Sequence, residues 1–389
     1  MNTGTTSPNQ NDRQSCEPEL SFPGWYKKRE PLTFPPAAMA MTAAPRHSPR
    51  LHRAIRVLVA TGLCSLLAMQ TSPASGPLRP AGKPRLAPLP KTAPSPGNNP
   101  TTAAKVTLGK QLFFDPRLSG DNKTSCASCH FPNRAFTDRR PRSLGQQGRP
   151  LSRNTPTVVN SGFLKHLFWD GRATSLEQQA LLPIASPVEM NQDLDALETE
   201  LNNIPGYARQ FRQVFKTGVT RNGIAQSLAA FQRTLISKPT PLDRFLGGDT
   251  SALSAEARRG LDLFRGSAGC VRCHNGPLLS DGKFYRLGVS VKDKGRQSVT
   301  GKTGDAFRFR TPSLRNIART SPYMHDGSQR TLEDVVTFYY RGVPTSIPGN
   351  LPLDAKPLLD NSFSEIPDLV AFLNSLSSPP LKIIPPKLP

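Results

Sequence analysis

Apolar residues along this chain recur mostly at helical spacing, and the alternation of apolar and polar positions that marks a β-rich protein is absent. The amphipathic segments 108–118 and 258–266 share the pattern G-x-x-L-F. Two later segments, 227–235 and 368–376, each carry the apolar spacing of a closing helix. The pattern predicts an all-α fold with long loops, in which pairs of similar segments recur.

One apolar run lies outside this helical pattern. Residues 57–69 follow the basic stretch 46–56 and precede small residues at 74–76. This is the order of a secretory signal, and the run is short for a membrane span. A buried helix of a folded domain is the alternative. We expect residues 1–75 to be a leader with a signal-peptide-like segment, and the rest of the chain to be exported and not membrane-spanning.

Proline marks two segments that we expect to be extended. Residues 71–100 hold nine prolines, and residues 379–389 hold five. Such density disfavours packed helices and is typical of linkers and tails. We predict a Pro-rich linker over 76–103, a Pro-rich tail over 379–389, and a globular part between them.

The formal net charge of the chain is +22. Residues 1–75 contain eight Lys or Arg and four Asp or Glu, so their removal takes the charge from +22 to +18. A positive charge of this size favours solubility, and it also suits docking to an acidic protein partner. No compact basic motif is present in the sequence, which argues against nucleic acid as the partner.

Two short motifs, CASCH at 126–130 and CVRCH at 270–274, carry the strongest chemical signal. In C-x-x-C-H both thiols form thioethers with one haem, and the adjacent histidine of the same helix binds the iron. A zinc site built from both cysteine pairs, or a redox dithiol, is the alternative. Neither explains a histidine after both pairs. We therefore predict two covalently bound c-type haems, one on Cys126, Cys129 and His130, the other on Cys270, Cys273 and His274.

The chain also repeats itself around these motifs. NTPTVVN at 154–160 matches RTPSLRN at 310–316, and WDGRATSLE at 169–177 matches HDGSQRTLE at 325–333. Both matches have the same offset of 156 residues and need no gap. The repeat predicts two tandem copies of one small, cytochrome c-like helical haem domain, over 104–246 and 247–378.

The same offset sets Tyr339 opposite Pro183. In small helical cytochromes the second axial ligand of the iron comes from a segment well after the attachment motif. Proline offers no side-chain donor there, whereas tyrosine is a known haem ligand. The first iron is thus expected to keep an open sixth position, and the second to be bound by His274 and Tyr339. The alternative for Tyr339 is an aromatic ring packed in the core, which is also what we expect for Tyr340.

Taken together, these motifs resemble the bacterial di-haem cytochrome c peroxidase family. The resemblance covers residues 104–378 and rests on LGKQLFFDPRLS, SCASCH, RNTPTVVN, FWDGRATSLEQQALLPIASPVEMN, FRTPSLRNIARTSPYMHDG and CVRCH. It implies a periplasmic oxidoreductase that reduces hydrogen peroxide at the first haem with electrons passed through the second. At the position of Tyr339 the family has methionine in ordinary peroxidases and tyrosine in its MauG branch, so this chain is similar to that branch.

The resemblance also implies roles for single residues. Glu189 and Gln179 would stand in the distal pocket of the first haem, where a carboxylate can move a proton as the O–O bond breaks. Trp169 would stand between the haems and carry electrons, with His325 at its repeat position as a hydrogen-bonding residue. One calcium ion would bind at the positions matching Asn154, Thr320 and Pro322.

Two features depart from the family. Ordinary members place a histidine that caps the first haem where this chain has Gln146, so we expect that haem to be open without prior reduction. The MauG member that acts on a methylamine dehydrogenase precursor uses a surface tryptophan near its second haem motif, and this sequence has no tryptophan there. Oxidation of that same partner is therefore not expected.

The sequence thus predicts a di-haem c-type peroxidase. The expected reductant is a small electron-donor protein, a cytochrome c or a cupredoxin, or an oxidisable protein substrate. One alternative is a MauG-type oxidase that modifies residues of a protein substrate, which Tyr339 favours. Another is a non-catalytic di-haem electron carrier, which Pro183 argues against because a pure carrier would close both irons.

Overall fold

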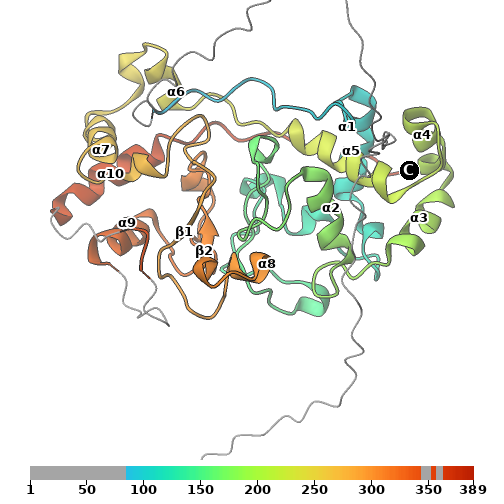
Figure 1. Cartoon of the computed structure of the whole chain (residues 1–389). Coiled ribbons are helices and arrows are strands. Elements are labelled where there is room, and N and C mark those ends of the chain that lie inside the picture. The colour runs from blue at the N-terminus through green and yellow to red at the C-terminus, as the bar shows by residue number, and fades with distance from the viewer. Residues whose placement is uncertain (1–84, 343–351, 356–361) are drawn as a thin grey trace, which may run out of the picture. The chain divides into compact units, whose positions relative to one another are not determined.

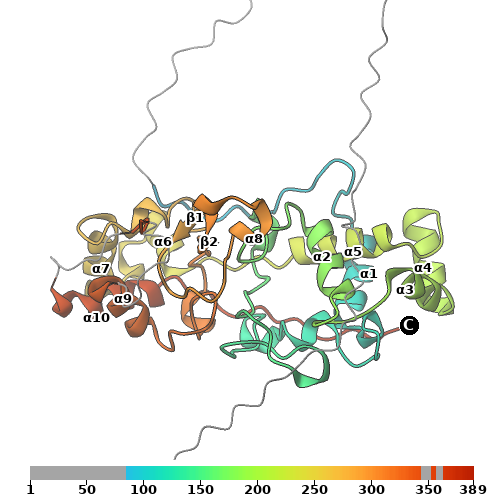
Figure 2. The ribbon, with the colours of Figure 1, turned by 60° about the horizontal axis from the view of Figure 1, so that its bottom comes forward.

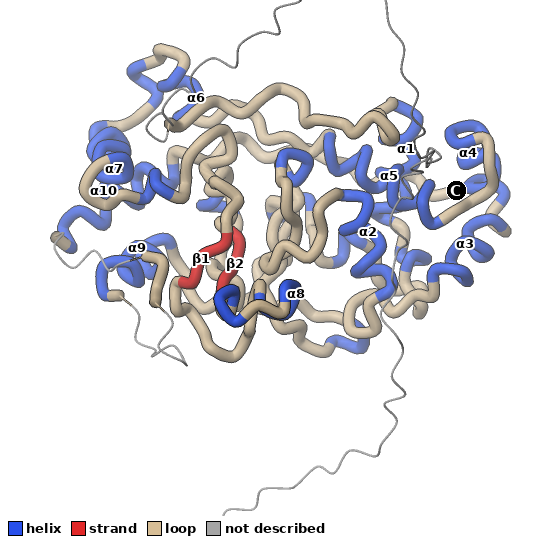
Figure 3. The backbone as a smooth tube through the Cα atoms, in the orientation of Figure 1, coloured by secondary structure: helices blue, strands red, loops and turns tan. Residues whose placement is uncertain are grey.

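Short helices and long loops make up most of the structure (Figure 3). The computed structural model describes residues 85–342, 352–355 and 362–389. The leader expected over 1–75, its apolar run included, lies outside these residues, as does the part of the linker before Arg85. Among the residues described, no helix is long and apolar enough to cross a membrane.

The helices follow each other with few strands between them (Figure 1). In chain order they are α1 (Ala103–Phe114), α2 (Leu176–Ala185), α3 (Leu194–Asn202), α4 (Pro205–Phe215), α5 (Arg221–Arg233), α6 (Pro241–Leu246), α7 (Ala255–Arg265), α8 (Gln297–Thr300), α9 (Leu332–Arg341) and α10 (Ile366–Asn374). Two short strands, β1 (Phe284–Arg286) and β2 (Arg308–Arg310), pair antiparallel with Phe284 opposite Arg310. The fold is mostly helical, as the apolar periodicity predicts, and it adds a small sheet that the periodicity does not predict.

Several helices begin at a serine or threonine whose side-chain oxygen accepts a backbone N–H of the first turn. Thr102 caps α1, Ser175 caps α2 and Thr331 caps α9 in this way. Such a cap typically contributes about 1 kcal/mol of stability. These residues therefore define where the helices start, although the loops that lead into them are long.

Two large hydrophobic cores are present in the described residues, and each contains one pair of closely packed helices. α1 packs on α5 in the first core, and α7 packs on α10 in the second. A Cβ at Gly109 would lie 1.8 Å from the Ser227 carbonyl oxygen, and a Cβ at Gly260 would lie 1.9 Å from the Asp368 carbonyl oxygen. Glycine is thus required at both helix contacts, which explains the shared G-x-x-L-F pattern. Figures 1 and 2 show the two pairs in separate groups of helices.

The loops after the two motifs share local structure where their sequences match. Leu167 forms an antiparallel bridge with Ala173, and Tyr323 forms one with Gln329. The residue after the first member of each bridge has a positive φ, 63° in the first loop and 70° in the second. The two loops therefore share an unusual backbone conformation as well as a sequence pattern.

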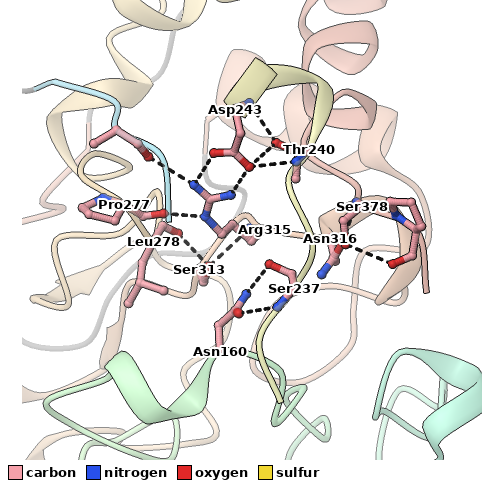
Figure 4. A network of polar contacts seen from close by, with 12 residues as sticks. Asn160, Ser237, Thr240, Asp243, Pro277, Leu278, Ser313, Arg315, Asn316 and Ser378 are labelled. Atoms are coloured by element: carbon pink, nitrogen blue, oxygen red, sulfur yellow. Dashed lines mark hydrogen bonds and ion pairs between the residues drawn. The ribbon is translucent and has the colours of Figure 1, made fainter. Parts of the chain in front are cut away.

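A second repeated feature is an asparagine that ends each N/RTP segment. Asn160 and Asn316 have left-handed φ angles of 64° and 62°. The Asn160 side-chain oxygen accepts the Ser237 N–H at 2.9 Å, and that of Asn316 accepts the Ser378 N–H at 2.8 Å. Figure 4 shows both asparagines in the same arrangement. Each asparagine joins its loop to the chain that follows the closing helix of its core.

Both Pro-rich ends of the described chain connect the two cores. Leu86 is buried in the second core, whereas Asn99 accepts a hydrogen bond from Lys105 of α1 at 2.9 Å. At the other end, the tail leaves α10 in the second core, and its residues Leu381 and Ile383 pack on the first. Figure 1 shows the C-terminus near α1 and α4. The tail is thus extended but packed on the helices.

Candidate functional site

The first C-x-x-C-H motif forms a single turn rather than part of a longer helix. Cys126–Ser128 is a 3-10 turn, and the His130 N–H closes it by donating to the Cys126 carbonyl at 2.9 Å. The His130 Nδ1 atom lies 3.0 Å from the Phe136 carbonyl oxygen. Because a carbonyl only accepts hydrogen bonds, Nδ1 carries the proton and Nε2 keeps its lone pair. The motif therefore presents two thiols and one metal-binding nitrogen from one turn.

The second motif has the same geometry. Cys270–Arg272 is a 3-10 turn, and the His274 N–H donates to the Cys270 carbonyl at 2.9 Å. The His274 Nδ1 atom donates to the Leu279 carbonyl at 3.0 Å. A fixed Nδ1–H leaves Nε2 as the ligand atom and makes the imidazole a stronger donor to a metal.

The cysteines do not have the properties of a redox dithiol or of one shared zinc site. Burial raises the pKa of Cys126 to about 12 and the pKa values of Cys129 and Cys270 to about 11. A reactive dithiol needs a lowered thiol pKa instead. Cys126 packs on the first core and Cys270 on the second. The two pairs therefore serve two separate sites, as the haem prediction requires.

A cavity of about 830 Å³ lies beside the second motif. It is lined by Cys270, Cys273 and His274 of the motif and by Tyr339 of α9. Its volume falls in the range of roughly 300–1,000 Å³ that is usual for cofactor pockets. Many further lining residues are apolar, among them Phe264, Leu314, Val336, Leu369 and Leu373.

The donors in this cavity fit a haem iron. His274 offers its unprotonated Nε2, and Tyr339 offers a phenolic oxygen from the cavity lining. Burial raises the pKa of Tyr339, and the neighbouring Cys270 and Cys273 add to this, so the phenol holds its proton until a cation replaces it. The next residue, Tyr340, packs instead in the second core.

The lining of the same cavity includes Trp169 and the residues expected at the calcium site. Trp169 Nε1 donates to the Asn154 carbonyl at 2.9 Å, and Asn154 Nδ2 donates to the Arg140 carbonyl at 2.8 Å. Thr320 and Pro322 also line the cavity. An asparagine amide oxygen and backbone carbonyls are ligand types that calcium takes. The tryptophan is thus joined by one hydrogen bond to a residue of the candidate calcium site.

Glu189 lies in the turn that follows α2, near the first motif. Burial raises the pKa of its carboxyl group, and the positive charge of Arg172 opposes that rise. Gln146 lies against the same turn. Its N–H donates to the Val188 carbonyl at 3.1 Å, and its Nε2 donates to the Met190 carbonyl at 3.2 Å. Gln146, where the family resemblance predicts a lost capping histidine, is thus hydrogen-bonded to the residues on either side of Glu189.

Gln179 and Pro183 lie on α2, four residues apart and therefore on one face of the helix. The Pro183 carbonyl accepts the N–H groups of Ser186 and Met190 at 3.3 and 3.2 Å. These bonds fold the chain back after the helix and into the Glu189 turn. The structure thus places the three residues expected in the first pocket on α2 and on the turn that α2 leads into.

Arg310 of β2 is a lining residue of the cavity that sequence reasoning missed. It is buried, and burial lowers its pKa to about 10. Its backbone N–H donates to the Trp169 carbonyl at 2.8 Å, and its Nε donates to the Phe168 carbonyl at 3.3 Å. The alternation in FRFRT at 307–311 is the signal that could have revealed this strand, but it spans only five residues.

His325 also lines the cavity, at the repeat position of Trp169. Its ring stacks on Phe309 with a centroid distance of 3.7 Å, and burial lowers its pKa to about 4. Its Nε2 has no hydrogen-bond partner among the residues described. The ring is therefore neutral at physiological pH and has one nitrogen available for a ligand in the cavity.

Comparisons with known proteins agree with this geometry. Residues 103–251 match the protein family described as di-haem cytochrome c peroxidase. The methylamine utilization protein MauG of Methylorubrum extorquens is 42% identical over 296 residues, which cover 75% of this chain and 83% of the relative. Cytochrome-c peroxidase IdrP1 of Denitromonas iodatirespirans is 42% identical over 327 residues, which cover 75% and 86%. The crystal structure of a MauG-like protein associated with microbial copper homeostasis aligns with a TM-score of 0.67 and 34% identity, over 75% of this chain and 95% of that one.

Proposed function

Because this chain belongs to the di-haem cytochrome c peroxidase family, we propose that it reduces hydrogen peroxide in the pocket of His130 with electrons delivered through the pocket of His274. The protein is a haem peroxidase, an oxidoreductase that acts on peroxide. Cys126 and Cys129 would hold the first haem, and Cys270 and Cys273 the second. When bound, the haems supply the redox chemistry that turns peroxide into water.

One observation supports the division of roles between the pockets. Pro183 lies in α2 where Tyr339 lies in α9, while the histidine of each motif is held in the same way. A pocket without a second donor leaves room for a small substrate, whereas a pocket with a tyrosine does not. We therefore assign peroxide to the first pocket and electron transfer to the second. The two proposed domains, 104–246 and 247–378, would each hold one haem, although Leu242 of α6, at the end of the first, packs in the second core.

Glu189 is the proposed acid–base residue for peroxide. Burial raises the pKa of its carboxyl group, and the positive charge of Arg172 partly offsets that rise. A carboxylate of this kind can take a proton from one peroxide oxygen and return it to the other, and it works best when its pKa is close to the working pH. Gln179, on the same face of α2 as Pro183, would orient the substrate by hydrogen bonding.

Trp169 is the proposed relay between the pockets. It lines the cavity of the second motif, and its indole N–H is held by the Asn154 carbonyl at 2.9 Å. A calcium ion at Asn154, Thr320 and Pro322 would hold this indole in place through Asn154. The proposed calcium would thus act on the relay rather than on peroxide.

The proposed partners follow from charge and from the family. The positive net charge favours an acidic donor protein. The proposed donor is a small cytochrome c or a cupredoxin with an acidic docking surface. Export of the chain to the periplasm would bring it together with such donors. No role for nucleic acid is proposed.

A MauG-type oxidase that modifies a protein substrate is the second candidate. The tyrosine at the cavity of His274 favours it. Trp169 is the one tryptophan among the residues described, so the structure offers no surface tryptophan near the second motif to pass oxidising equivalents to a partner. We therefore rank this function below peroxide reduction.

The test is a spectrum of the diferric protein before and after one equivalent of peroxide. We expect one high-spin and one low-spin haem, and an immediate change without prior reduction. Two low-spin haems that stay silent until one electron is added would show that another side chain caps the first iron. Turnover with a reduced cytochrome c or cupredoxin then separates the peroxidase from the oxidase, which consumes no such donor.

A further inference from the structure

Three consecutive carbonyls follow the second motif, and each accepts a hydrogen bond from a defined side chain. The Pro277 carbonyl accepts from Arg315 Nε, the Leu278 carbonyl accepts from Ser313 Oγ at 2.6 Å, and the Leu279 carbonyl accepts from His274 Nδ1. Figure 4 shows the first two of these bonds. The loop that receives the histidine N–H is thus held at the two preceding carbonyls by Arg315 and Ser313.

Arg315 is itself fixed by a buried ion pair. Its two terminal nitrogens donate to Asp243 of α6 at 2.8 and 2.9 Å, and only 1% of the Arg315 side chain and 7% of the Asp243 side chain are exposed. Asp243 also accepts the Thr240 N–H at 2.8 Å and the Thr240 hydroxyl at 2.9 Å. A bidentate pair of this kind allows a guanidinium only one orientation.

The N-terminal segment closes the same loop from another direction. Arg315 donates to the Ala87 carbonyl at 3.1 Å, and the Gly276 N–H donates to the Arg85 carbonyl at 2.8 Å. Leu86, between these two contacts, is buried in the second core. The loop after the motif is therefore clamped between the start of the described chain and the ion pair.

The first motif provides an internal comparison. Thr157, at the repeat position of Ser313, donates to the Ala135 carbonyl at 2.7 Å, next to the Phe136 carbonyl that receives the His130 Nδ1 proton. The position of Arg315 is occupied there by Val159, which packs in the first core. Both loops thus have the hydroxyl contact. Of the two described loops, only the loop after the second motif is also held by an arginine–aspartate pair, Arg315 with Asp243.

We propose that Arg315, with Asp243, is a positioning residue that holds the Leu279 carbonyl against His274 and so sets the reduction potential of the second haem apart from that of the first. This inference rests on the proposed attachment of a haem at Cys270 and Cys273. A well-placed acceptor on Nδ1–H makes the imidazole a stronger donor and stabilises the oxidised metal. Loosening the loop weakens that bond, so the potential of the second haem rises.

The experiment compares four variants of the loaded protein. Arg315→Lys keeps the charge beside Asp243 but cannot reach Asp243, Pro277 and Ala87 together. Arg259→Lys is its matched control, because it alters the exposed pair with Asp368 on the same core without contact to the loop. Ser313→Ala removes the hydroxyl contact from the second loop, and Thr157→Val removes the equivalent contact from the first. Both are smaller changes, which keep the test possible if Arg315→Lys does not fold. We measure the haem content by the pyridine haemochrome spectrum, the midpoint potentials of both haems, and the electron paramagnetic resonance of the low-spin haem.

We expect Arg315→Lys and Ser313→Ala to raise the reduction potential of the second haem and to change its low-spin signal, without effect on the first haem. Thr157→Val should shift the potential of the first haem only. Arg259→Lys should shift neither potential. The positioning role is overturned if Arg315→Lys and Ser313→Ala bind two haems but leave the reduction potential and the low-spin signal of the second haem unchanged. Fewer than two haems in the unmodified protein instead overturn the proposed attachment, and this inference with it.

Discussion

Tyr339 occupies in α9 the place that Pro183 occupies in α2. Both helices start from a hydroxyl cap, Ser175 for α2 and Thr331 for α9, and both follow a loop of the same conformation. The backbone that leads to Pro183 and the backbone that leads to Tyr339 therefore have the same local structure, and only the side chain differs. One place gains a phenol, and the other gains a residue whose side chain has no donor atom for a metal.

Replacing Tyr339 tests whether that phenol binds the second iron. We expect Tyr339→Phe to change the spectrum of the second haem and to leave the first haem unaltered, because a hard anionic ligand is lost. Tyr339→His should produce bis-histidine ligation and raise the potential, since imidazole stabilises the oxidised metal less than phenolate does. Absorption and electron paramagnetic resonance spectra measure both effects.

Tyr340→Phe is the matched control for this pair of variants. Its ring is buried in the second core and its hydroxyl donates to Glu365 at 2.8 Å, away from the cavity lining. No change in either haem spectrum is expected. A second-haem spectrum identical in the unmodified protein and Tyr339→Phe would reduce Tyr339 to a packing residue.

Glu189→Gln tests the acid–base assignment. The variant should bind two haems but react with peroxide more slowly by ~10²–10⁴-fold, the usual range for general acid–base catalysis. Burial raises the pKa of Glu189, and the carboxylate is the form that accepts a proton. The rate in the unmodified protein should therefore rise as the pH rises through this raised pKa, and the variant should lack that rise.

Stopped-flow absorbance across a pH series measures these rates, with the exposed Glu256→Gln as a control. Equal rates for Glu189→Gln and the unmodified protein at every pH would remove Glu189 from the mechanism. Proton transfer would then have to come from Gln179-bound water.

Gly109→Ala tests the helix contact of the first core. The added Cβ would lie 1.8 Å from the Ser227 carbonyl oxygen, so α1 and α5 must separate. We expect a loss of about 1–3 kcal/mol in the free energy of unfolding, as for other overpacked cores. Gly97→Ala is the control, because nothing lies within 4 Å of its added Cβ. Thermal unfolding that is equal in both variants would contradict the contact.

Asp243→Asn tests the buried ion pair of the second core. The change leaves the Arg315 guanidinium buried without a counter-charge, which should cost about 3–5 kcal/mol of stability. Asp368→Asn, in an exposed pair, should leave the unfolding midpoint nearly unchanged. Denaturant unfolding at pH 7 measures the difference.

The pH dependence of this pair has a definite sign. Burial alone would raise the pKa of Asp243, but the hydrogen bonds from Arg315 and Thr240 outweigh it and hold the pKa below the ordinary value of 3.8. A carboxyl whose pKa is lowered in the folded state stabilises the fold above its unfolded pKa. This contribution is lost as the pH falls below 3.8 and through the folded pKa. Acid unfolding of Asp243→Asn should lack that component.

The sequence carries enough information for the motifs and for the repeat, because both depend on short-range patterns. The offset between Thr155 and Thr311 needs no gap, and the matched φ angles of Asn160 and Asn316 show that equal sequence here gives equal backbone. The G-x-x-L-F pattern likewise reports a contact that only glycine permits.

Other features depend on contacts that no local pattern reveals. Arg315 and Asp243 are 72 positions apart, and nothing near either residue predicts the pair. The strands β1 and β2 have three residues each, too few for alternation to stand out. The packing of Leu381 and Ile383 on the first core also cannot be predicted from the sequence, because a packed Pro-rich tail and an unpacked one have the same composition.

That tail has a consequence for the order in which the protein is made. The first core is built from helices near the start of the described chain, yet Leu381 and Ile383 complete its surface from the far end. A chain that emerges N-terminus first can pack the helix pair of α1 and α5 early, but it cannot cover this face until the last residues have been synthesised. The core whose helices are made first is therefore covered last, by residues at the far end of the chain.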